Sequence, residues 1–263
     1  MLPLDLLPQS WRSELDQEII EPIRSGASGA LVYRIQGTSG LTRFLKIAVG
    51  RYVEDLSREI ERTKWLHAVQ INVPMILKAS AQAEVAAVLM SAVGGQPAED
   101  CRESPADVIS VLAKGVAQFH ALPIDSCPYD ESVSARLARA RADIASGRVD
   151  SRGFDSRNLG ISPQKLFDRL LWAATSVRED LVVVHGDATF SNILVDSTGR
   201  VGFVDCGHCG KADRYVDLAL VCAEIEGQFG GQWIASFLEA YGLGLSMLDP
   251  LKARFFLDLY ELF

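Results

Sequence analysis

The chain has 263 residues, of which 48% are hydrophobic and 23% are charged, enough to bury a sizeable core in one large domain or two lobes. This apolar content argues against disorder, and no apolar run approaches the roughly 18 residues that span a bilayer. The formal net charge of −8 would repel phosphate backbones, which argues against a nucleic-acid partner. A small cationic molecule would be attracted.

The first residues lack the basic and apolar regions of a secretory signal, so we expect a cytoplasmic protein without a membrane segment. The five cysteines form an odd and sparse set. Such a set argues against a disulfide scaffold and fits a reducing compartment.

The first part of the chain is predicted to form mainly strands, with one helix between them. Residues 30–36 and 42–48 are separated by a turn containing Gly and Ser, which predicts a hairpin. Residues 53–67 carry apolar side chains at helical spacing. Two further apolar stretches, residues 75–79 and 85–90, precede a Gly-Gly pair. We expect this lobe to end near residue 95.

Residues 96–263 are predicted to be mainly helical. An apolar helical face runs over residues 108–119. Residues 181–184 and 201–204 are predicted short strands, and the second closes a hairpin after a turn. Residues 146–163 are polar and aperiodic, so either a loop or a pair of helices fits them. The class is therefore α+β, with two lobes and a ligand between them.

Several conspicuous residues are better explained by packing or by loop structure than by a catalytic or metal-binding role. Cys206-Gly207-His208-Cys209 has the form of a thiol-disulfide exchange motif, but Asp205 precedes it. Residues 210–213 are predicted to be loop, which argues against a redox motif, and a zinc site at these cysteines and His208 lacks an obvious fourth ligand. His120 ends an apolar helix and is predicted to be a packed or capping histidine. The tryptophans predicted to lie in the core are Trp65, Trp172 and Trp233.

The strongest chemical signal is the loop motif His185-Gly186-Asp187, followed by Asn192. Phosphoryl transfer needs a carboxylate near the attacking hydroxyl and oxygen ligands that hold Mg²⁺ on the phosphates. Asp187 and Asn192 lie five positions apart and can point into the same cleft. Asp205, which opens an Asp-Cys-Gly element after a hairpin, supplies a second metal ligand. This is the spacing of a kinase catalytic loop and its metal-binding element.

The first lobe supplies the other parts that a kinase needs. Lys46 lies in the apolar strand 44–47, facing inward or at an edge, and kinases place such a lysine on the α- and β-phosphates. Its expected partner is Glu59 on the following helix. The run 25–30, which includes Ser28, can close over phosphates with backbone N–H groups, although it lacks a P-loop lysine. We therefore expect ATP and Mg²⁺ as cofactors.

The segment 183–192, with residues 212–215 and 217–219 downstream, resembles the aminoglycoside phosphotransferases, most of all the 3′-phosphotransferases that act on kanamycin and neomycin. Further similar segments are residues 89–91, 127–129 and 260–263. The resemblance implies a two-lobed protein-kinase-like fold, with a nucleotide-binding lobe (1–95) and a catalytic and substrate-binding lobe (96–263). It also implies ATP-dependent phosphorylation of an aminoglycoside hydroxyl, with the 3′-OH expected, and hence antibiotic resistance.

The resemblance also implies roles for individual residues. It makes Asp187 the catalytic base. The implied magnesium ligands are Asn192 and Asp205. The implied nucleotide-binding residues are Ser28, Phe44, Lys46, Glu59, Ser91 and Val93. The residues implied to meet ammonium groups of the substrate are Glu224, Glu261 and, through its α-carboxylate, Phe263.

The chain departs from the 3′-phosphotransferase pattern in its substrate-binding part. Acidic residues common in the polar insertion are replaced by Gly153, Ser156 and Arg157. His208 stands where Arg is frequent, and Tyr260 where an Asp commonly precedes the glutamate of the tail. Two alternatives therefore stay open: a kinase of this fold that acts on another small hydroxylated metabolite, and a nucleotide-binding protein without turnover. We expect a monomer or weak dimer, with the acceptor hydroxyl and the choice between ATP and GTP undecided.

Overall fold

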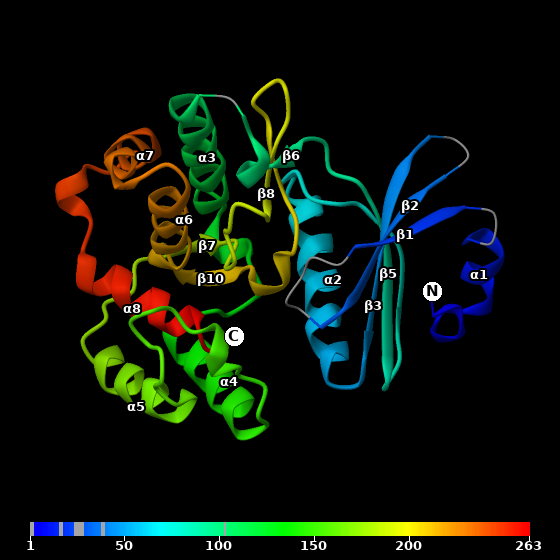
Figure 1. The fold of residues 1–263 in the computed structure, drawn as a ribbon, viewed down its shortest axis with the longest axis horizontal. Coiled ribbons are helices and arrows are strands. Elements are labelled where there is room, and N and C mark those ends of the chain that lie inside the picture. The colour runs from blue at the N-terminus through cyan, green and yellow to red at the C-terminus, as the bar shows by residue number, and fades with distance from the viewer. Residues whose placement is uncertain (1–2, 16–17, 24–28, 38–39, 103) are drawn as a thin grey trace. The chain divides into compact units, whose positions relative to one another are not determined.

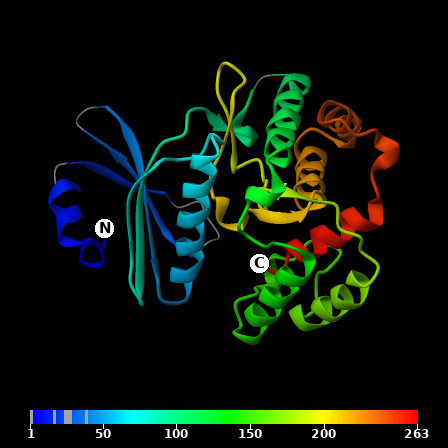
Figure 2. The same ribbon diagram turned by 180° about the vertical axis from the view of Figure 1, so that it is seen from behind.

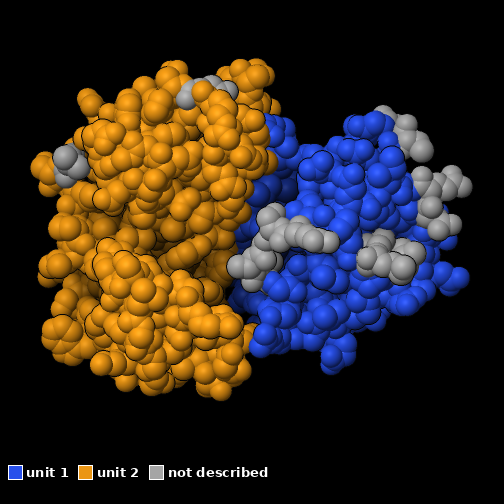
Figure 3. Space-filling model, viewed as in Figure 1, with its two compact units in different colours: residues 1–95, 202–207 blue, residues 96–201, 208–263 orange. Residues whose placement is uncertain are grey.

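The computed structural model describes residues 3–15, 18–23, 29–37, 40–102 and 104–263. It separates into two compact units, which are coloured separately in Figure 3. Unit 1 comprises residues 1–95 and 202–207, and unit 2 comprises residues 96–201 and 208–263. Unit 1 is rich in strands and unit 2 is mainly helical, which confirms the predicted α+β class.

Unit 1 is built on a five-stranded antiparallel sheet with the order β1-β2-β3-β5-β4. Its strands are β1 (Ile19–Ile23), β2 (Leu31–Gln36), β3 (Thr42–Val49), β4 (Ile76–Ala81) and β5 (Val85–Ser91). Its α-helices α1 (Gln9–Leu15) and α2 (Val53–Ala68) lie on opposite faces of the sheet (Figure 1). The predicted hairpin is the β2–β3 pair, and the predicted helix is α2; both are confirmed.

Strand β3 shows how the sheet is covered on both faces. Leu45 and Ile47 join the apolar cluster around α1, whereas Ala48 joins the cluster around α2. Because successive residues of a strand face opposite sides of the sheet, Phe44 and Lys46 share the α2 side with Ala48. The position of Lys46 in the strand thus directs its side chain toward α2.

The short segment 202–207 belongs to unit 1, whereas the lobes predicted from the sequence (1–95 and 96–263) put it in the second lobe. The Phe203 N–H donates to the Asn72 carbonyl at 2.9 Å. Arg62, a buried residue of α2, donates from Nη1 to the Gly207 carbonyl at 2.8 Å. These hydrogen bonds hold the segment on α2 and on the chain that follows it.

Unit 2 contains helices on both sides of short strands, as the two views of Figures 1 and 2 show. Its α-helices are α3 (Pro105–His120), α4 (Val133–Ala145), α5 (Pro163–Ala174), α6 (Tyr215–Gln228), α7 (Ile234–Tyr241) and α8 (Pro250–Tyr260). Its strands are β6 (Gln96–Pro97), β7 (Leu181–Val184), β8 (Ile193–Val195) and β10 (Gly210–Asp213), while β9 (Val201–Phe203) runs from unit 2 into unit 1. β7 pairs with β10, and β6, β8 and β9 form a second sheet.

Three helices of unit 2 begin with the same local signal, a polar cap followed by proline. Ser104, Ser162 and Asp249 precede α3, α5 and α8, and each side chain accepts a backbone N–H of the first turn. Such caps satisfy donors that the helix itself leaves without partners, and proline suits the first helical position. Among the described residues, no helix is both long and apolar enough to cross a membrane.

In unit 2, the structure decides three of the predictions made from the sequence. Residues 210–213, predicted to be loop, form β10 because pairing with β7 satisfies their backbone groups. Residues 146–162 form a loop with one 3₁₀ turn rather than a helix pair, and Pro163 begins α5. Trp172, predicted in the core, is 79% exposed, since α5 turns its opposite face inward. The buried residues of α5 are Leu166, Phe167 and Leu170.

Candidate active site

In unit 1, a buried lysine binds two carboxylates. Lys46 donates from Nζ to Glu59 Oε1 at 2.7 Å and also to Asp205 Oδ1. The lysine is 6% exposed, so it faces inward rather than lying at an edge. Burial alone would lower its pKa, but the two carboxylates raise the pKa of Lys46 above its ordinary value. The ammonium therefore stays charged within this cluster.

Asp205 reaches the lysine through an unusual backbone conformation. Its φ is 58°, in the left-handed region that residues other than Gly, Asn and Asp seldom adopt. Strained conformations of this kind concentrate at functional sites, where the surroundings hold them in place. About 43% of the Asp205 side chain is exposed. Its carboxylate can therefore bind Lys46 and still be reached by a ligand.

The other predicted nucleotide-binding residues lie on the same sheet. Phe44, which is half-buried, shares the face of β3 that carries Lys46. Ser91 is the last residue of β5, the strand beside β3, and Val93 follows two residues later. Ser28 lies outside the described residues. The structure thus brings Phe44 and Lys46 together and places Ser91 at the end of the neighbouring strand.

In unit 2, the His-Gly-Asp motif directly follows β7. Asn192 donates from Nδ2 to Asp187 Oδ2 at 2.8 Å and to the Asp187 carbonyl at 3.0 Å. The predicted pair is therefore joined by its side chains. Because the amide nitrogen of Asn192 is turned to Asp187, the amide oxygen is the end that a cation could bind. Amide and carboxylate oxygens are ligands that Mg²⁺ accepts, so Asn192 and Asp205 fit this ion.

The glycine of the motif is required by its surroundings. Gly186 has a φ of 88°, and a Cβ there would lie 2.1 Å from the His208 carbonyl oxygen. Only glycine tolerates both the conformation and the contact. The turn that presents Asp187 therefore depends on this residue.

A buried aspartate on α6 binds the backbone of the His-Gly-Asp motif. Asp217 accepts the N–H groups of His185 and Gly186, each at 2.8 Å. Its Oδ2 also lies 3.0 Å from His120 Nε2, which donates because a carboxylate only accepts. Burial alone would raise the pKa of Asp217, but these donors and the nearby histidines lower it below its ordinary value. The charged carboxylate thus fixes the backbone of the loop.

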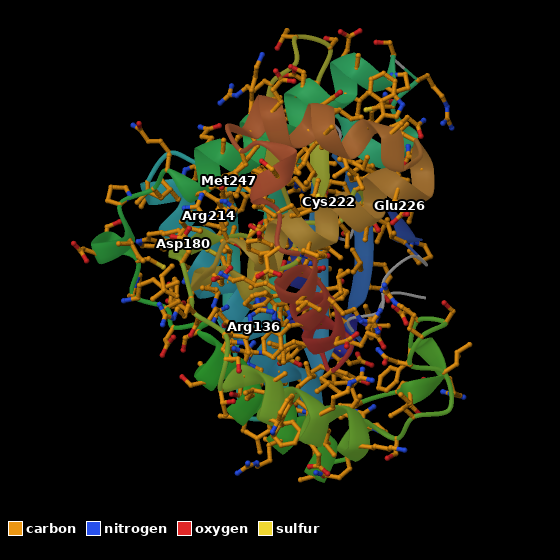
Figure 4. All side chains as sticks on the ribbon, turned by 90° about the vertical axis from the view of Figure 1, so that its left-hand side faces the viewer. Arg136, Asp180, Arg214, Cys222, Glu226 and Met247 are labelled. Carbon is orange, nitrogen blue, oxygen red and sulfur yellow. The ribbon has the colours of Figure 1, made fainter. Side chains whose placement is uncertain are left out.

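His120, which donates to Asp217, is itself held by a chain of hydrogen bonds. The Nδ1 atom of His120 lies 2.7 Å from the Tyr241 hydroxyl, which accepts from Arg214 Nη1 at 3.0 Å. Arg214 also donates from Nε to Asp180 Oδ2 at 2.6 Å, and the two residues lie side by side in Figure 4. His120 therefore serves as a packed histidine beneath the loop, in agreement with the prediction.

Tyr260 is a second partner of Asp187, which the sequence did not predict. Its hydroxyl donates to Asp187 Oδ1 at 2.7 Å. The two residues are 73 positions apart, and no local pattern connects them. The sequence shows that Tyr260 stands where 3′-phosphotransferases commonly have an Asp, but it does not indicate the contact with Asp187.

Two predicted substrate-binding glutamates lie in unit 2. Glu261 accepts from Asn158 Nδ2 at 3.0 Å through Oε1, while its Oε2 is buried and has no partner among the described residues. Burial raises the pKa of Glu261. Glu224 accepts the Phe190 N–H at 3.1 Å. A buried carboxylate oxygen without a donor suits an ammonium ligand.

Phe263, which is 39% exposed, contacts a histidine and two arginines through its ring. The His208 ring lies edge-on at 5.9 Å, and the guanidinium carbons of Arg136 and Arg139 lie 5.5 and 5.4 Å from the ring centre. Arg139 is held by the fully buried Glu131 at 2.6 and 2.7 Å. Arg136 is labelled in Figure 4. These contacts fix the Phe263 ring, whereas the role predicted for its carboxylate stays a prediction.

The cysteine motif 206–209 contributes packing through its two central residues: the Gly207 carbonyl accepts from Arg62, and the His208 ring lies edge-on to Phe263. All five cysteines are buried thiols. Within the described ranges, no cluster of three or more His, Cys, Asp or Glu side chains is arranged to hold a metal.

These features define a class of protein. An antiparallel unit that carries a Lys-Glu-Asp cluster, and a helical unit that carries a His-Gly-Asp loop with its asparagine, are typical of kinases. Residues 19–256 match the phosphotransferase enzyme family, and the chain belongs to this family. It is an ATP-dependent small-molecule kinase, and ATP with Mg²⁺ serves as the phosphoryl donor.

Comparison with known proteins confirms the resemblance over nearly the whole chain. The chain is 31% identical to an aminoglycoside 3′-phosphotransferase of Niallia circulans, with 97% of each chain covered. It is 33% identical to one of Streptomyces fradiae, with 92% of this chain and 94% of the relative covered.

Solved structures agree with these relatives. An aminoglycoside 3′-phosphotransferase of type VIII superposes with a TM-score of 0.88 at 35% identity, with 97% of each chain covered. An aminoglycoside phosphotransferase of Streptomyces rimosus, solved with ADP and streptomycin, superposes with a TM-score of 0.81 at 28% identity. That match covers 100% of this chain and 99% of the other. The kinase-like fold is therefore confirmed.

Proposed function

We propose that this protein transfers the γ-phosphoryl group of ATP to a hydroxyl of an aminoglycoside, with the 3′-hydroxyl as the expected site, and thereby confers resistance. The observation that carries the proposal is the Asp187–Asn192 pair, joined at 2.8 Å on a loop that Asp217 holds by two backbone N–H groups. Relatives named aminoglycoside 3′-phosphotransferases support the substrate class.

Asp187 is the group placed to act on the acceptor. It would accept a hydrogen bond from the acceptor hydroxyl and take its proton as the oxygen–phosphorus bond forms and the bond to the ADP oxygen breaks. The carboxylate must be correctly aimed for this role. Asn192 fixes one of its oxygens, and the turn at Gly186 fixes its backbone.

Lys46 and Glu59 would orient the nucleotide in the first lobe, residues 1–95. The lysine, held by Glu59 at 2.7 Å, would bind the α- and β-phosphates. Asn192 and Asp205 would hold Mg²⁺ through their oxygens. The chemistry that Mg²⁺ supplies when bound is positive charge that offsets the charge of the transferring phosphoryl group.

The remaining nucleotide contacts concern the adenine ring and the phosphate loop. Phe44 would stack on the ring, while the Ser91 carbonyl and the Val93 N–H would bond its edge. Ser28 would lie over the phosphates. The shared face of Phe44 and Lys46 on β3 supports this arrangement.

Acidic groups in the second lobe, residues 96–263, would recognise the ammonium groups of the acceptor. Glu261 has a buried oxygen without a partner among the described residues, which favours a cationic ligand. Glu224 and the α-carboxylate of Phe263 would add negative charge. The net charge of −8 attracts cations to the whole protein.

A second candidate is a kinase of the same fold that phosphorylates another small hydroxylated amine or sugar. The contact that favours it is the Tyr260 hydroxyl on Asp187, because a neutral phenol stands where the tail of 3′-phosphotransferases commonly has an acidic residue. A 30% identical relative is a streptomycin 3″-kinase of Streptomyces griseus, so a different hydroxyl also belongs among the tests.

An acceptor screen tests the proposal and separates the candidates. Release of ADP is followed with kanamycin, neomycin and streptomycin, and with neutral sugars and amino alcohols as controls. ADP release that depends on an aminoglycoside supports the proposal. Release that depends only on a control compound supports the second candidate, and nucleotide binding without any release indicates a protein without turnover.

We further propose that the enzyme is cytoplasmic, is a monomer or weak dimer, and does not bind nucleic acid. The negative net charge supports the last point. Light scattering of the purified protein over a range of concentrations tests the oligomeric state.

A further inference from the structure

The carboxylate of Asp187 is bound by a donor at each oxygen. Asn192 donates to Oδ2 at 2.8 Å, and the Tyr260 hydroxyl donates to Oδ1 at 2.7 Å. A general base must lie within about 2.6–3.2 Å of the oxygen whose proton it takes. The Tyr260 hydroxyl therefore already makes the contact that an acceptor hydroxyl must make with Asp187.

The backbone at Tyr260 is held in place by its neighbours on the chain. It is the last residue of α8, and Leu259 and Leu262 on either side of it are fully buried. Its carbonyl accepts the Phe263 N–H at 3.2 Å. The backbone at Tyr260 is thus held by the core of unit 2, so that displacement of the phenol needs only a rotation of the side chain.

Tyr260 can act only as a protonated phenol in this environment. Its burial and the negative charge of Asp187 raise the pKa of Tyr260 far above its ordinary value, and Glu224 acts in the same direction. Arg136 lowers it by a smaller amount. The hydroxyl therefore keeps its proton and donates it to the hydrogen bond with Asp187.

We propose that the Tyr260 hydroxyl occupies the acceptor position on Asp187 when no acceptor is bound, and that an incoming acceptor hydroxyl displaces it. The inference rests on the proposed role of Asp187 as the base. With the phenol in place, Oδ1 does not receive a hydrogen bond from water in that position. The phenol thereby suppresses the wasteful reaction of ATP with water.

The reaction that Tyr260 suppresses is hydrolysis of the phosphoryl donor. In it, a water oxygen forms a bond to the γ-phosphorus, the bond to the ADP oxygen breaks, and a water proton passes to Asp187. The products are ADP and inorganic phosphate. Displacement of the phenol also costs the true acceptor a charge-assisted hydrogen bond, which raises its KM.

The variant Tyr260→Phe removes the hydroxyl and keeps the ring. We expect ATP hydrolysis without acceptor to rise about tenfold and the KM for the acceptor to fall, since a hydrogen bond to a charged group contributes roughly this factor or more. Tyr215→Phe is the matched control, because the Tyr215 hydroxyl contacts the Met247 carbonyl and the Asp249 N–H rather than Asp187. Hydrolysis by Tyr260→Phe at or below the wild-type rate would overturn the inference.

A second measurement follows Tyr260 in the wild-type protein without turnover. The six tyrosines are labelled with ¹³C at Cζ, and the Tyr260 signal is assigned from its loss in Tyr260→Phe. Movement of that signal as kanamycin binds supports displacement of the phenol. Saturable binding of kanamycin without movement would contradict it.

These measurements separate the inference from the proposed function. If kanamycin does not bind and no aminoglycoside is phosphorylated, the proposed acceptor is wrong, and the hydrolysis comparison still decides the role of Tyr260. If wild-type protein phosphorylates an aminoglycoside while Tyr260→Phe hydrolyses ATP no faster, the inference fails and the proposed function stands.

Discussion

The carboxylates of the two units are held by different kinds of partner. In unit 1, Glu59 and Asp205 both bind the ammonium of Lys46. In unit 2, the donors to Asp187 are an amide and a phenol, which are neutral. The carboxylates that we propose to organise the nucleotide are thus stabilised by a cation. The carboxylate that is to take a proton is aimed by neutral groups, which leave its negative charge for the acceptor hydroxyl.

The two sites also differ in the part of the chain through which they are held in place. The Lys46 cluster joins side chains of a strand, a helix and the segment 202–207, which are all parts of unit 1. The Asp187 loop is held mainly through its backbone, by Asp217. Changes at Lys46 should therefore act on folding and nucleotide binding together, whereas changes at Asp187 should act on turnover alone.

The substitution Asp187→Asn should have the largest effect on activity, and it should lower the turnover number without changing nucleotide affinity. We expect the turnover number to fall by about 10²–10⁴, the usual contribution of a positioned base. ADP affinity should change little, because the Lys46 cluster lies in unit 1 and is untouched. Steady-state kinetics and calorimetric ADP titration check both parts. Near-normal turnover would show that another group takes the proton.

Lys46→Met should destabilise the protein by on the order of 3 kcal/mol and weaken nucleotide binding. Removing one partner of a buried ion pair leaves the other charges without compensation. The matched control is Lys64→Met on α2, whose pair with Glu61 is largely exposed. That change should cost about 1 kcal/mol or less. Urea unfolding measures both, and equal losses would mean that the buried cluster does not stabilise unit 1.

Asp217→Asn should cost about 2 kcal/mol at neutral pH, because the amide cannot replace a charged acceptor. The pKa of Asp217 is lowered in the folded protein, so its contribution is complete above its ordinary value near 3.8. It is lost as the pH falls through the lower, folded value. The difference in unfolding free energy between wild type and variant should therefore be level from pH 5 to 8 and shrink below about pH 4. A difference that grows on acidification would contradict the assignment.

The double variant Cys206→Ala, Cys209→Ser should have the smallest effect. Both thiols are buried, and a conservative loss there costs on the order of 1 kcal/mol. Most phosphotransfer activity should remain. Burial raises the pKa of the Cys222 thiol to about 12, so that residue is also unreactive. Thiol titration of the unfolded, non-reduced protein should find five thiols, and a Cys206–Cys209 disulfide that changes activity would refute this view.

Local patterns in the sequence predicted the elements that carry the site. The hairpin β2–β3, the helix α2 and the spacing from Asp187 to Asn192 depend on neighbours close in sequence, and the structure contains all three. Strand β10 was missed because its four residues show no apolar alternation and gain their pairing only from β7.

The long-range contacts of the site could not be predicted in this way. Asp217 lies 31 residues from Gly186, and Tyr260 lies 73 residues from Asp187. Their hydrogen bonds depend on how α6 and α8 pack, which no short pattern records. The exposure of Trp172 could not be predicted either, because hydrophobicity alone does not say which face of α5 is buried.

Isotope-labelled ATP tests the central claim most directly. Kanamycin is incubated with the wild-type protein, Mg²⁺ and ATP whose γ-phosphoryl group carries three non-bridging ¹⁸O atoms. If Asp187 directs transfer to a hydroxyl, mass spectrometry should find kanamycin with one phosphoryl group that retains all three labelled oxygens, and phosphorus–proton correlation should place it on the 3′-oxygen. Label that appears only in inorganic phosphate, with kanamycin unchanged, would contradict the assignment of this protein as an aminoglycoside kinase.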